Sequence, residues 1–380
     1  MSSVDLSSVI RPGDGLLWGQ ACAEPQTLVE ALIAQREALS RSSVFLGISY
    51  SGLLRPEHAD HLRFTSYCGT GSNRALAQAG VLEILPSPYS RLGELLRSGR
   101  IKCDVAMVQV SPPNARGEYS LGLAVEYLAP ALEVARAVIA EVNDQIPWTR
   151  TKPVLRRDDF DLVVQTSRPP VYLYYGEPSE VDRAIARHAA ALVPEGATVE
   201  CGIGALPNAI LTALAGRDIR YHSGVVCEAV RLVRPKSCLG GVLMGTQALF
   251  DWARENPALE LVSSDVTHGA ATLARIERFV AINSAVEVDL TGQVNGEVAR
   301  GTYVGAVGGA LDFIRAANQS PGGLAITALP AARIVERLSG PVSVPRSEAG
   351  VFVTERGVAD LRGCTLAERA RRLQRISGSS

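Results

Sequence analysis

Short apolar runs alternate with amphipathic stretches along almost the whole chain. In the first half an amphipathic stretch at residues 91–98 precedes the apolar run Val105–Val110, and in the second half a stretch at residues 246–254 precedes a run at residues 259–262. Short apolar runs fit strands that are buried on both faces, and the amphipathic stretches fit helices that cover a sheet. The alternation therefore predicts an α/β fold with mostly parallel sheets.

A segment rich in proline and charge interrupts this alternation at residues 147–178, and a clear helical pattern follows at residues 181–193. A chain of 380 residues is long enough for two domains, each with its own core. We therefore expect one domain at residues 1–175 and a second at residues 176–380. Because the same alternation resumes after the boundary, the two are expected to be related open α/β/α domains.

Opposite charges are nearly balanced in this chain, which carries 38 Lys and Arg, 39 Asp and Glu, and a net charge of -1. Because both signs are interspersed, no surface for nucleic acid or an anionic membrane is expected. No apolar run approaches the ~20 residues that span a bilayer, and no signal-peptide pattern opens the chain. These features predict a cytoplasmic protein that binds a small molecule.

Seven cysteines are scattered without CxxC pairing, and five histidines show no HExxH spacing. This usage fits reduced thiols in a cytoplasm, and it predicts neither a structural zinc site nor a catalytic metal. A serine hydrolase is also disfavoured, because the chain has no GxSxG motif.

Residues 280–313 combine a short β-branched run with a glycine cluster that opens a helix. Gly305, Gly308 and Gly309 would let backbone N–H groups approach a ligand closely at the start of that helix. One interpretation is a site for an anion or an oxyanion. The other is a tight turn in which glycine only satisfies the backbone geometry.

A second glycine turn, GIGALP, contains Gly202, Gly204 and Pro207 between an expected strand at residues 198–201 and a helix. Proline stands where a dinucleotide-binding fingerprint has its third glycine, and no acid follows about 20 residues later. The turn therefore disfavours NAD binding. A plain turn and a loop that binds an anion or a pantetheine arm both remain open.

Polar side chains at the ends of other expected strands are further candidates. Gln109 and Ser111 end the first-domain strand at Val105–Val110, and Glu355 directly follows a strand at residues 351–354. The carboxyl ends of strands are where open α/β sheets bind ligands, so these residues are expected to line a cleft. For Glu355 a hydrogen-bonded loop carboxylate is the alternative.

Several motifs occur at the spacing of one known family: residues 108–112 (VQVSP), 120–122 (SLG), 202–209 (GIGALPNA), 244–246 (MGT), 281–293 (AINSAVEVDLTGQ), 308–315 and 353–363. From about residue 42 to residue 373 the chain resembles the acetyl-CoA hydrolase/transferase family, the single-chain class I CoA-transferases such as those for 4-hydroxybutyrate, butyrate and acetate. The resemblance implies two related domains with the active site in the cleft between them. It also implies an acyl-CoA thioester as substrate, no permanently bound cofactor and a homodimer or larger homo-oligomer.

In that family a glutamate at the end of a strand attacks the acyl-CoA and then carries CoA as a glutamyl thioester. The matching segment here, residues 221–228, reads YHSGVVCE and has Gly224 in the place of the glutamate. A glycine has no carboxylate to be acylated. The rest of the implied catalytic group is present: Asn283 to orient or donate to the reacting carbonyl, the Gly308 N–H as an oxyanion donor, and Glu355 in the acyl pocket.

The remaining residues expected to contact substrate or CoA are Gly202, Gly204, Pro207, Gly224, Gly305, Gly309, Gln109 and Ser111. Three side chains near Gly224 are candidates to replace the nucleophile. Glu228 would lie one turn beyond Gly224 on the same face if residues 225–233 formed a helix. For Cys227 the alternatives are an acyl thioester or a buried inert thiol, and for His222 they are a general base or a ring held by a hydrogen bond.

These observations predict an acyl-CoA enzyme that does not use a glutamyl-CoA intermediate. The cradle around Asn283 would polarise the thioester, and water or a small nucleophile would attack it directly. Two alternatives stay open: an ordinary CoA-transferase that uses Glu228, and a catalytically silent protein that binds CoA esters or serves as a partner subunit.

Overall fold

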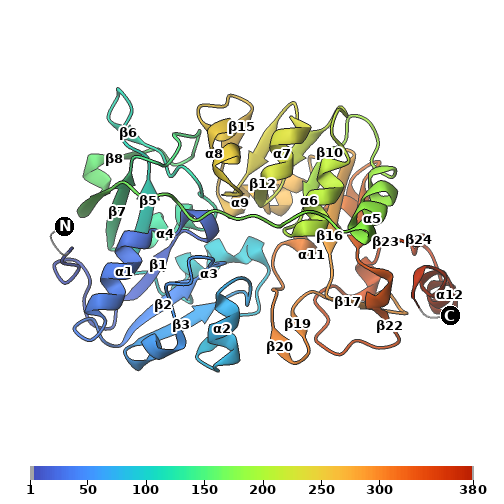
Figure 1. Cartoon of the computed structure of the whole chain (residues 1–380), viewed down its shortest axis with the longest axis horizontal. Coiled ribbons are helices and arrows are strands. Elements are labelled where there is room, and N and C mark those ends of the chain that lie inside the picture. Colours follow the sequence, from blue (N-terminus) through green and yellow to red (C-terminus); the bar gives the residue numbers. More distant parts are fainter. Residues whose placement is uncertain (1–3, 379–380) are drawn as a thin grey trace. The chain divides into compact units, whose positions relative to one another are not determined.

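The computed structural model describes residues 4–378 and divides into two compact units (Figure 1). Unit 1 contains the described residues up to Leu173 together with Gly241–Val266, and unit 2 contains Tyr174–Gly240 and the described residues from Thr267 onward. The first crossing adjoins the expected boundary at residue 175. The expectation that residues 176–380 form one domain differs from this division, because residues 241–266 belong to unit 1.

Backbone hydrogen bonds join this segment to earlier parts of unit 1. Leu243 N–H donates to the carbonyl oxygen of Leu123 at 2.7 Å, and Leu261 N–H donates to that of Arg150 at 2.9 Å. Contacts of this kind, between segments far apart in the sequence, contribute to placing residues 241–266 in unit 1.

Unit 1 is built on a parallel sheet of seven strands in the order β4-β3-β2-β1-β5-β7-β9. These strands are β1 (Gly15–Trp18), β2 (Ser42–Leu46), β3 (Leu62–Ser66), β4 (Leu82–Ile84), β5 (Val105–Val110), β7 (Ala137–Asn143) and β9 (Leu162–Thr166). Shorter strands are β6 (Glu118–Tyr119), β8 (Leu155–Arg156), β14 (Val242–Met244) and β15 (Leu259–Leu261). The helices are α1 (Gln26–Gln35), α2 (Asn73–Gln78), α3 (Leu92–Arg97), α4 (Leu128–Val134) and α8 (Gln247–Ala253).

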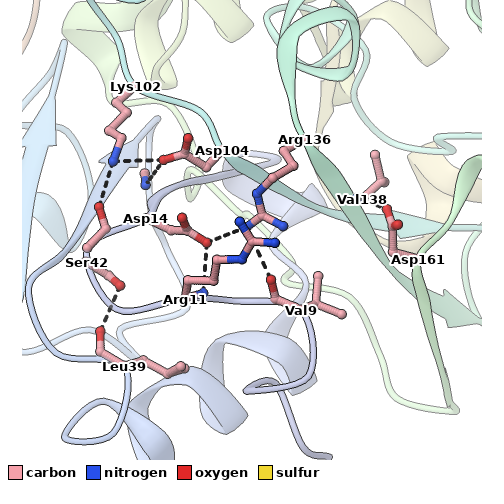
Figure 2. Close-up of polar contacts among 12 residues, drawn as sticks. Val9, Arg11, Asp14, Leu39, Ser42, Lys102, Asp104, Arg136, Val138 and Asp161 are labelled. Atoms are coloured by element: carbon pink, nitrogen blue, oxygen red, sulfur yellow. Dashed lines mark hydrogen bonds and ion pairs between the residues drawn. The ribbon is translucent and has the colours of Figure 1, made fainter.

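Polar contacts tie the amino ends of the strands in unit 1 together (Figure 2). The carboxylate of Asp104 accepts a hydrogen bond from Gly15 N–H at 2.7 Å, and that of Asp161 accepts one from Val138 N–H at 2.8 Å. Arg136 pairs with Asp14 at 2.6 Å. These contacts hold the amino ends of the strands together. Open parallel sheets bind their ligands at the carboxyl ends of the strands.

Unit 2 has a second sheet, in which β13-β11-β10-β16-β21-β23 are parallel and β24 is an antiparallel edge. Its strands are β10 (Thr198–Cys201), β11 (Arg220–His222), β13 (Cys238–Gly240), β16 (Phe279–Ser284), β21 (Leu324–Ala328), β23 (Val351–Thr354) and β24 (Gly357–Asp360). Smaller strands are β12 (Val225–Cys227), β17 (Glu287–Asp289), β18 (Val294–Asn295), β19 (Val298–Ala299), β20 (Thr302–Tyr303) and β22 (Ile334–Val335). The helices are α5 (Glu180–Ala190), α6 (Ala205–Thr212), α7 (Glu228–Val233), α10 (Ala270–Leu273), α11 (Ala310–Gln319) and α12 (Leu366–Ile376), and α9 (Ser264–Thr267) lies where the chain returns from unit 1 to unit 2.

Local sequence explains where the longer helices begin. Ser179 precedes α5 and forms a reciprocal capping box with Asp182, and Thr365 does the same with Glu368 at the start of α12. Such boxes satisfy backbone N–H groups that have no partner in the first turn.

Two parallel sheets with crossover helices confirm the predicted α/β class. Each unit also has its own apolar core, formed in unit 1 around Leu16 and Ile139 and in unit 2 around Phe279 and Phe352. Within residues 4–378, none of the helices combines the length and the apolar character that a membrane crossing requires.

Candidate active site

Several predicted residues lie together at the carboxyl ends of three neighbouring strands in unit 2. β10 lies between β11 and β16, and the three strands run in the same direction. Gly202 follows β10, Gly224 comes shortly after β11, and Asn283 lies at the end of β16. Open parallel sheets bind their ligands at the carboxyl ends of their strands.

The imidazole ring of His268 fills the space beside Gly224. A Cβ atom placed on Gly224 would lie 2.7 Å from Cε1 and 3.1 Å from Nε2 of His268. A Cβ atom on Gly309 would collide with the same ring, and the ring centroid is 4.5 Å from that of Phe313. Gly224 and Gly309 therefore leave room for His268, and a glutamate at position 224 would require the ring to move.

Thr267 holds both histidines of the site. The Nε2 atom of His222 lies 2.8 Å from the carbonyl oxygen of Thr267. The side-chain Oγ1 atom of Thr267 lies 2.8 Å from Nδ1 of His268. A carbonyl oxygen only accepts, so Nε2 of His222 carries the hydrogen. Burial lowers the pKa of His222, and it lowers the pKa of His268 to about 3, so both rings are neutral at neutral pH.

Asn283 is held by a carboxyl group that the sequence did not single out. Its Nδ2 donates to Oε2 of Glu200 at 2.8 Å, and both side chains are buried. Burial raises the pKa of Glu200 to about 8, against the opposing effect of this hydrogen bond. A Cβ atom on Gly202 would lie 3.1 Å from Oδ1 of Asn283, so the amide is confined between Glu200 and the glycine turn. An acid within a buried strand was the available signal for Glu200.

Backbone geometry accounts for the glycines of both turns. Gly204 has φ 122° and precedes α6, and Gly308 has φ 58° just before Gly309 and α11. A side chain on Gly305 would collide with the carbonyl oxygen of Gly296. Pro207 is buried within α6, where its carbonyl oxygen accepts from Sγ of Cys201 at 3.2 Å. Gly204, Gly305 and Gly308 are therefore required by the local backbone, whether or not they also contact a ligand.

The condition for placing Glu228 near Gly224, a helix over residues 225–233, is not met. Val225–Cys227 form strand β12, and α7 begins only at Glu228. Two β-branched residues in succession favour the strand. Glu228 therefore does not lie one helical turn beyond Gly224, and its carboxylate accepts from Arg231 at 3.0 Å.

Cys227 precedes α7 as a buried thiol, and burial raises its pKa to about 11. A protonated thiol is a poor nucleophile, so this environment favours the interpretation of an inert cysteine. The acyl-thioester alternative has no support from its surroundings.

The other predicted residues have partners within their own units. Glu355 lies between β23 and β24 and accepts from Ala331 N–H at 2.9 Å. In unit 1 the Gln109 side chain accepts from Asn143 at 3.1 Å, and the Ser111 hydroxyl accepts from Ser120 N–H at 3.2 Å. The structure thus groups Gly202, Gly224 and Asn283 together, and it gives Glu355, Gln109 and Ser111 local hydrogen bonds.

Two family models match the chain: the acetyl-CoA hydrolase/transferase N-terminal domain at residues 1–168 and the C-terminal domain at residues 245–380. The 4-hydroxybutyrate coenzyme A transferase of Clostridium kluyveri is 33% identical, over 95% of this chain and 90% of that protein. Butyryl-CoA:acetate CoA-transferase of Anaerostipes caccae is 28% identical, over 97% and 91%.

Solved structures agree with these relatives. RipA from Yersinia pestis superposes with a TM-score of 0.93 at 28% identity, covering 98% of this chain and 92% of that one. A 4-hydroxybutyrate CoA-transferase from Porphyromonas gingivalis gives a TM-score of 0.81 at 28% identity, with the same coverage of 98% and 92%. The resemblance inferred from the sequence motifs is confirmed, and the chain belongs to the acetyl-CoA hydrolase/transferase family.

Proposed function

We propose that this enzyme acts on an acyl-CoA thioester without forming a glutamyl-CoA intermediate, and that the acyl group passes directly to water or to another small nucleophile. The single observation that carries the proposal is the His268 ring beside Gly224, the residue that the sequence motif matches to the family's glutamate. Relatives include both CoA-transferases and acetyl-CoA hydrolases, among them a partial match to acetyl-CoA hydrolase of Saccharomyces cerevisiae at 27% identity over 199 residues. Acyl-CoA as substrate is therefore consistent with both kinds of relative.

The catalytic groups in this proposal stabilise the charge that develops on the thioester oxygen. The second N–H of the Asn283 amide and the backbone N–H of Gly308 would donate to that oxygen as the nucleophile attacks. Such preorganised donors lower a barrier by about 3–4 kcal/mol each. Glu200 supports this role because it fixes the Asn283 amide through the 2.8 Å hydrogen bond.

The alternative nucleophile is disfavoured by its local structure. Glu228 begins α7 and pairs with Arg231, and no helical turn connects it to Gly224. An ordinary CoA-transferase reaction through Glu228 would require this carboxylate to leave its partner and turn toward the site.

The test is a turnover assay with a panel of acyl-CoA thioesters, each with water alone, carboxylates or amines, followed by chromatography of free CoA and acyl products. We expect CoA release without any carboxylate. Asn283→Ala should lower kcat about 100- to 1,000-fold, whereas Asn256→Ala, which removes an amide bonded to Trp252 and Ala258 within unit 1, should not. Transfer that needs a carboxylate and is lost in Glu228→Gln would favour the ordinary reaction, and tight binding without turnover would favour a silent binding protein.

A homo-oligomer, a cytoplasmic location and the absence of a permanent cofactor stay predictions that accompany this proposal. Light scattering coupled to size-exclusion chromatography measures the first, and mass spectrometry of the native purified protein measures the third.

A further inference from the structure

His268 is the side chain that packs most closely against Gly224, the residue that matches the family's glutamate in the sequence motif. Apart from its chain neighbours, the three atoms nearest to a Cβ on Gly224 are Cε1, Nε2 and Nδ1 of His268, at 2.7, 3.1 and 4.0 Å. The Nε2 edge also faces Gly309, which follows the expected oxyanion donor Gly308. An imidazole nitrogen thus lies beside the backbone of both Gly224 and Gly309.

Two contacts orient this ring, and a further one holds the residue that makes the first of them. Nδ1 lies 2.8 Å from the Thr267 hydroxyl, the Phe313 ring packs at 4.5 Å, and the backbone of Thr267 is itself held by His222 at 2.8 Å. A base whose second nitrogen is positioned by a third group is the usual arrangement for proton transfer in nucleophilic catalysis. His268 is 4% exposed, so it is shielded from bulk solvent.

The exchange of a carboxylate for an imidazole changes which nucleophile the site can use. A glutamate attacks as an anion, and a carboxylate acceptor also attacks as an anion, so neither has a proton to lose. Water, alcohols and amines must lose a proton as they attack, and a neutral imidazole is in the protonation state to accept it. Because burial lowers the pKa of His268 to about 3, the developing oxyanion has to stabilise the imidazolium for this transfer to occur.

We infer that His268 is the proton acceptor of this enzyme and that its second substrate is a protic nucleophile, namely water, an alcohol or an amine, rather than a carboxylate. This inference rests on the function proposed above. Its evidence is the placement of the ring against Gly224 and Gly309 and its fixation by Thr267.

The proposed step balances without any further reagent. The oxygen or nitrogen of the nucleophile bonds to the thioester carbonyl carbon while its proton passes to Nε2 of His268. The carbonyl oxygen carries the negative charge, which pairs with the new imidazolium. The C–S bond then breaks, the CoA thiolate takes the proton from Nε2, and the products are free CoA and an acid, ester or amide.

The test compares His268→Gln with His188→Gln in steady-state assays with water, a primary alcohol, a primary amine, acetate and butyrate as acceptors. His188 bonds to the Thr354 carbonyl oxygen elsewhere in unit 2 and serves as the matched control. We expect the wild type to use the protic acceptors, and His268→Gln to lower kcat about 100- to 10,000-fold with little change in KM for the acyl-CoA. His188→Gln should retain wild-type kcat.

A second measurement does not depend on how the variant folds. Turnover by the wild type in deuterium oxide should show a normal solvent isotope effect on kcat, because a proton is in transit in the rate-limiting attack. Turnover without a covalent adduct that is unaffected by His268→Gln, or that shows no isotope effect, would overturn the inference but leave the proposed function standing. A glutamyl-CoA adduct with carboxylate acceptors only, or no turnover of any thioester, would overturn both.

Discussion

The side-chain amide of Asn283 on β16 donates a hydrogen bond of 2.8 Å to the carboxyl group of Glu200 on the neighbouring strand β10, in the sheet of unit 2. Glu200 is 2% exposed and Asn283 is 9% exposed. Because burial raises the pKa of Glu200 to about 8, most of this carboxyl group is protonated at pH 7. A neutral acceptor therefore sets the direction of the amide that is proposed to polarise the substrate.

Replacing Glu200 tests this positioning role. Glu200→Gln keeps an acceptor oxygen in place, so kcat should stay within a few-fold of the wild type. Glu200→Leu leaves the Asn283 amide without its partner, and an orphaned buried donor costs about 1–3 kcal/mol. We expect the free energy of unfolding to fall by that amount and kcat to fall while KM changes little. Equal kcat values for the two variants would contradict the role.

Glu200 also predicts how stability depends on pH. Its pKa is raised from 4.5 to about 8 in the folded protein. Between these pH values the folded state keeps a proton that the unfolded state has released, so the free energy of unfolding falls as pH rises through this window. Glu200→Gln should make that fall shallower in urea titrations at pH 5 to 9. Burial also raises the pKa values of Glu126 and Glu141 to about 7, so these two groups lower the free energy of unfolding in the same direction as pH rises. Both are present in the wild type and in Glu200→Gln, so they do not affect the comparison.

The packing of His268 against Gly224 predicts a coupled pair. Gly224→Ala places a methyl group against the imidazole, and such overpacking costs about 1–3 kcal/mol. Gly296→Ala is the control, because its Cβ would meet only ordinary contacts at 3.6 Å or more and its φ is not positive. In thermal and urea unfolding, the penalty of Gly224→Ala should largely disappear in a His268→Ala background. An unchanged penalty in that background would place the clash elsewhere.

Glu228 is predicted to have no catalytic role at the start of α7. Glu228→Gln should leave kcat unchanged and alter the free energy of unfolding by less than about 1 kcal/mol, because its ion pair with Arg231 is partly exposed. Steady-state kinetics and urea unfolding measure both quantities. A loss of activity comparable to that of Asn283→Ala would contradict this assignment and return Glu228 to the site.

Sequence patterns predicted the strands of this fold well where burial on both faces makes the pattern strong. The run at Val105–Val110 is β5 with the same bounds, and every residue of it is buried. The interpretation failed where elements are short, since residues 225–233 contain a three-residue strand followed by a six-residue helix. The assignment of residues 241–266 depends on distant backbone partners, which no local pattern reports.

The candidate site was predicted in part for the same reason. Gly224, Asn283 and Gly308 were identified because they lie in continuous motifs. His268 was missed, because its approach to Gly224 and Gly309 arises only when three distant segments of unit 2 pack together. Glu200 had a weak signal, as an acid in an otherwise apolar strand, whose meaning depends on the strand that lies beside it.

The central claim is that acyl transfer proceeds without a covalent glutamyl-CoA enzyme. Its most direct test is the intact mass of the protein, sampled during turnover of an acyl-CoA and followed by mapping of the peptide that contains residues 221–231. We predict an unmodified mass while free CoA accumulates. A mass increase equal to bound CoA, located on Glu228 and discharged by a carboxylate, would contradict the claim.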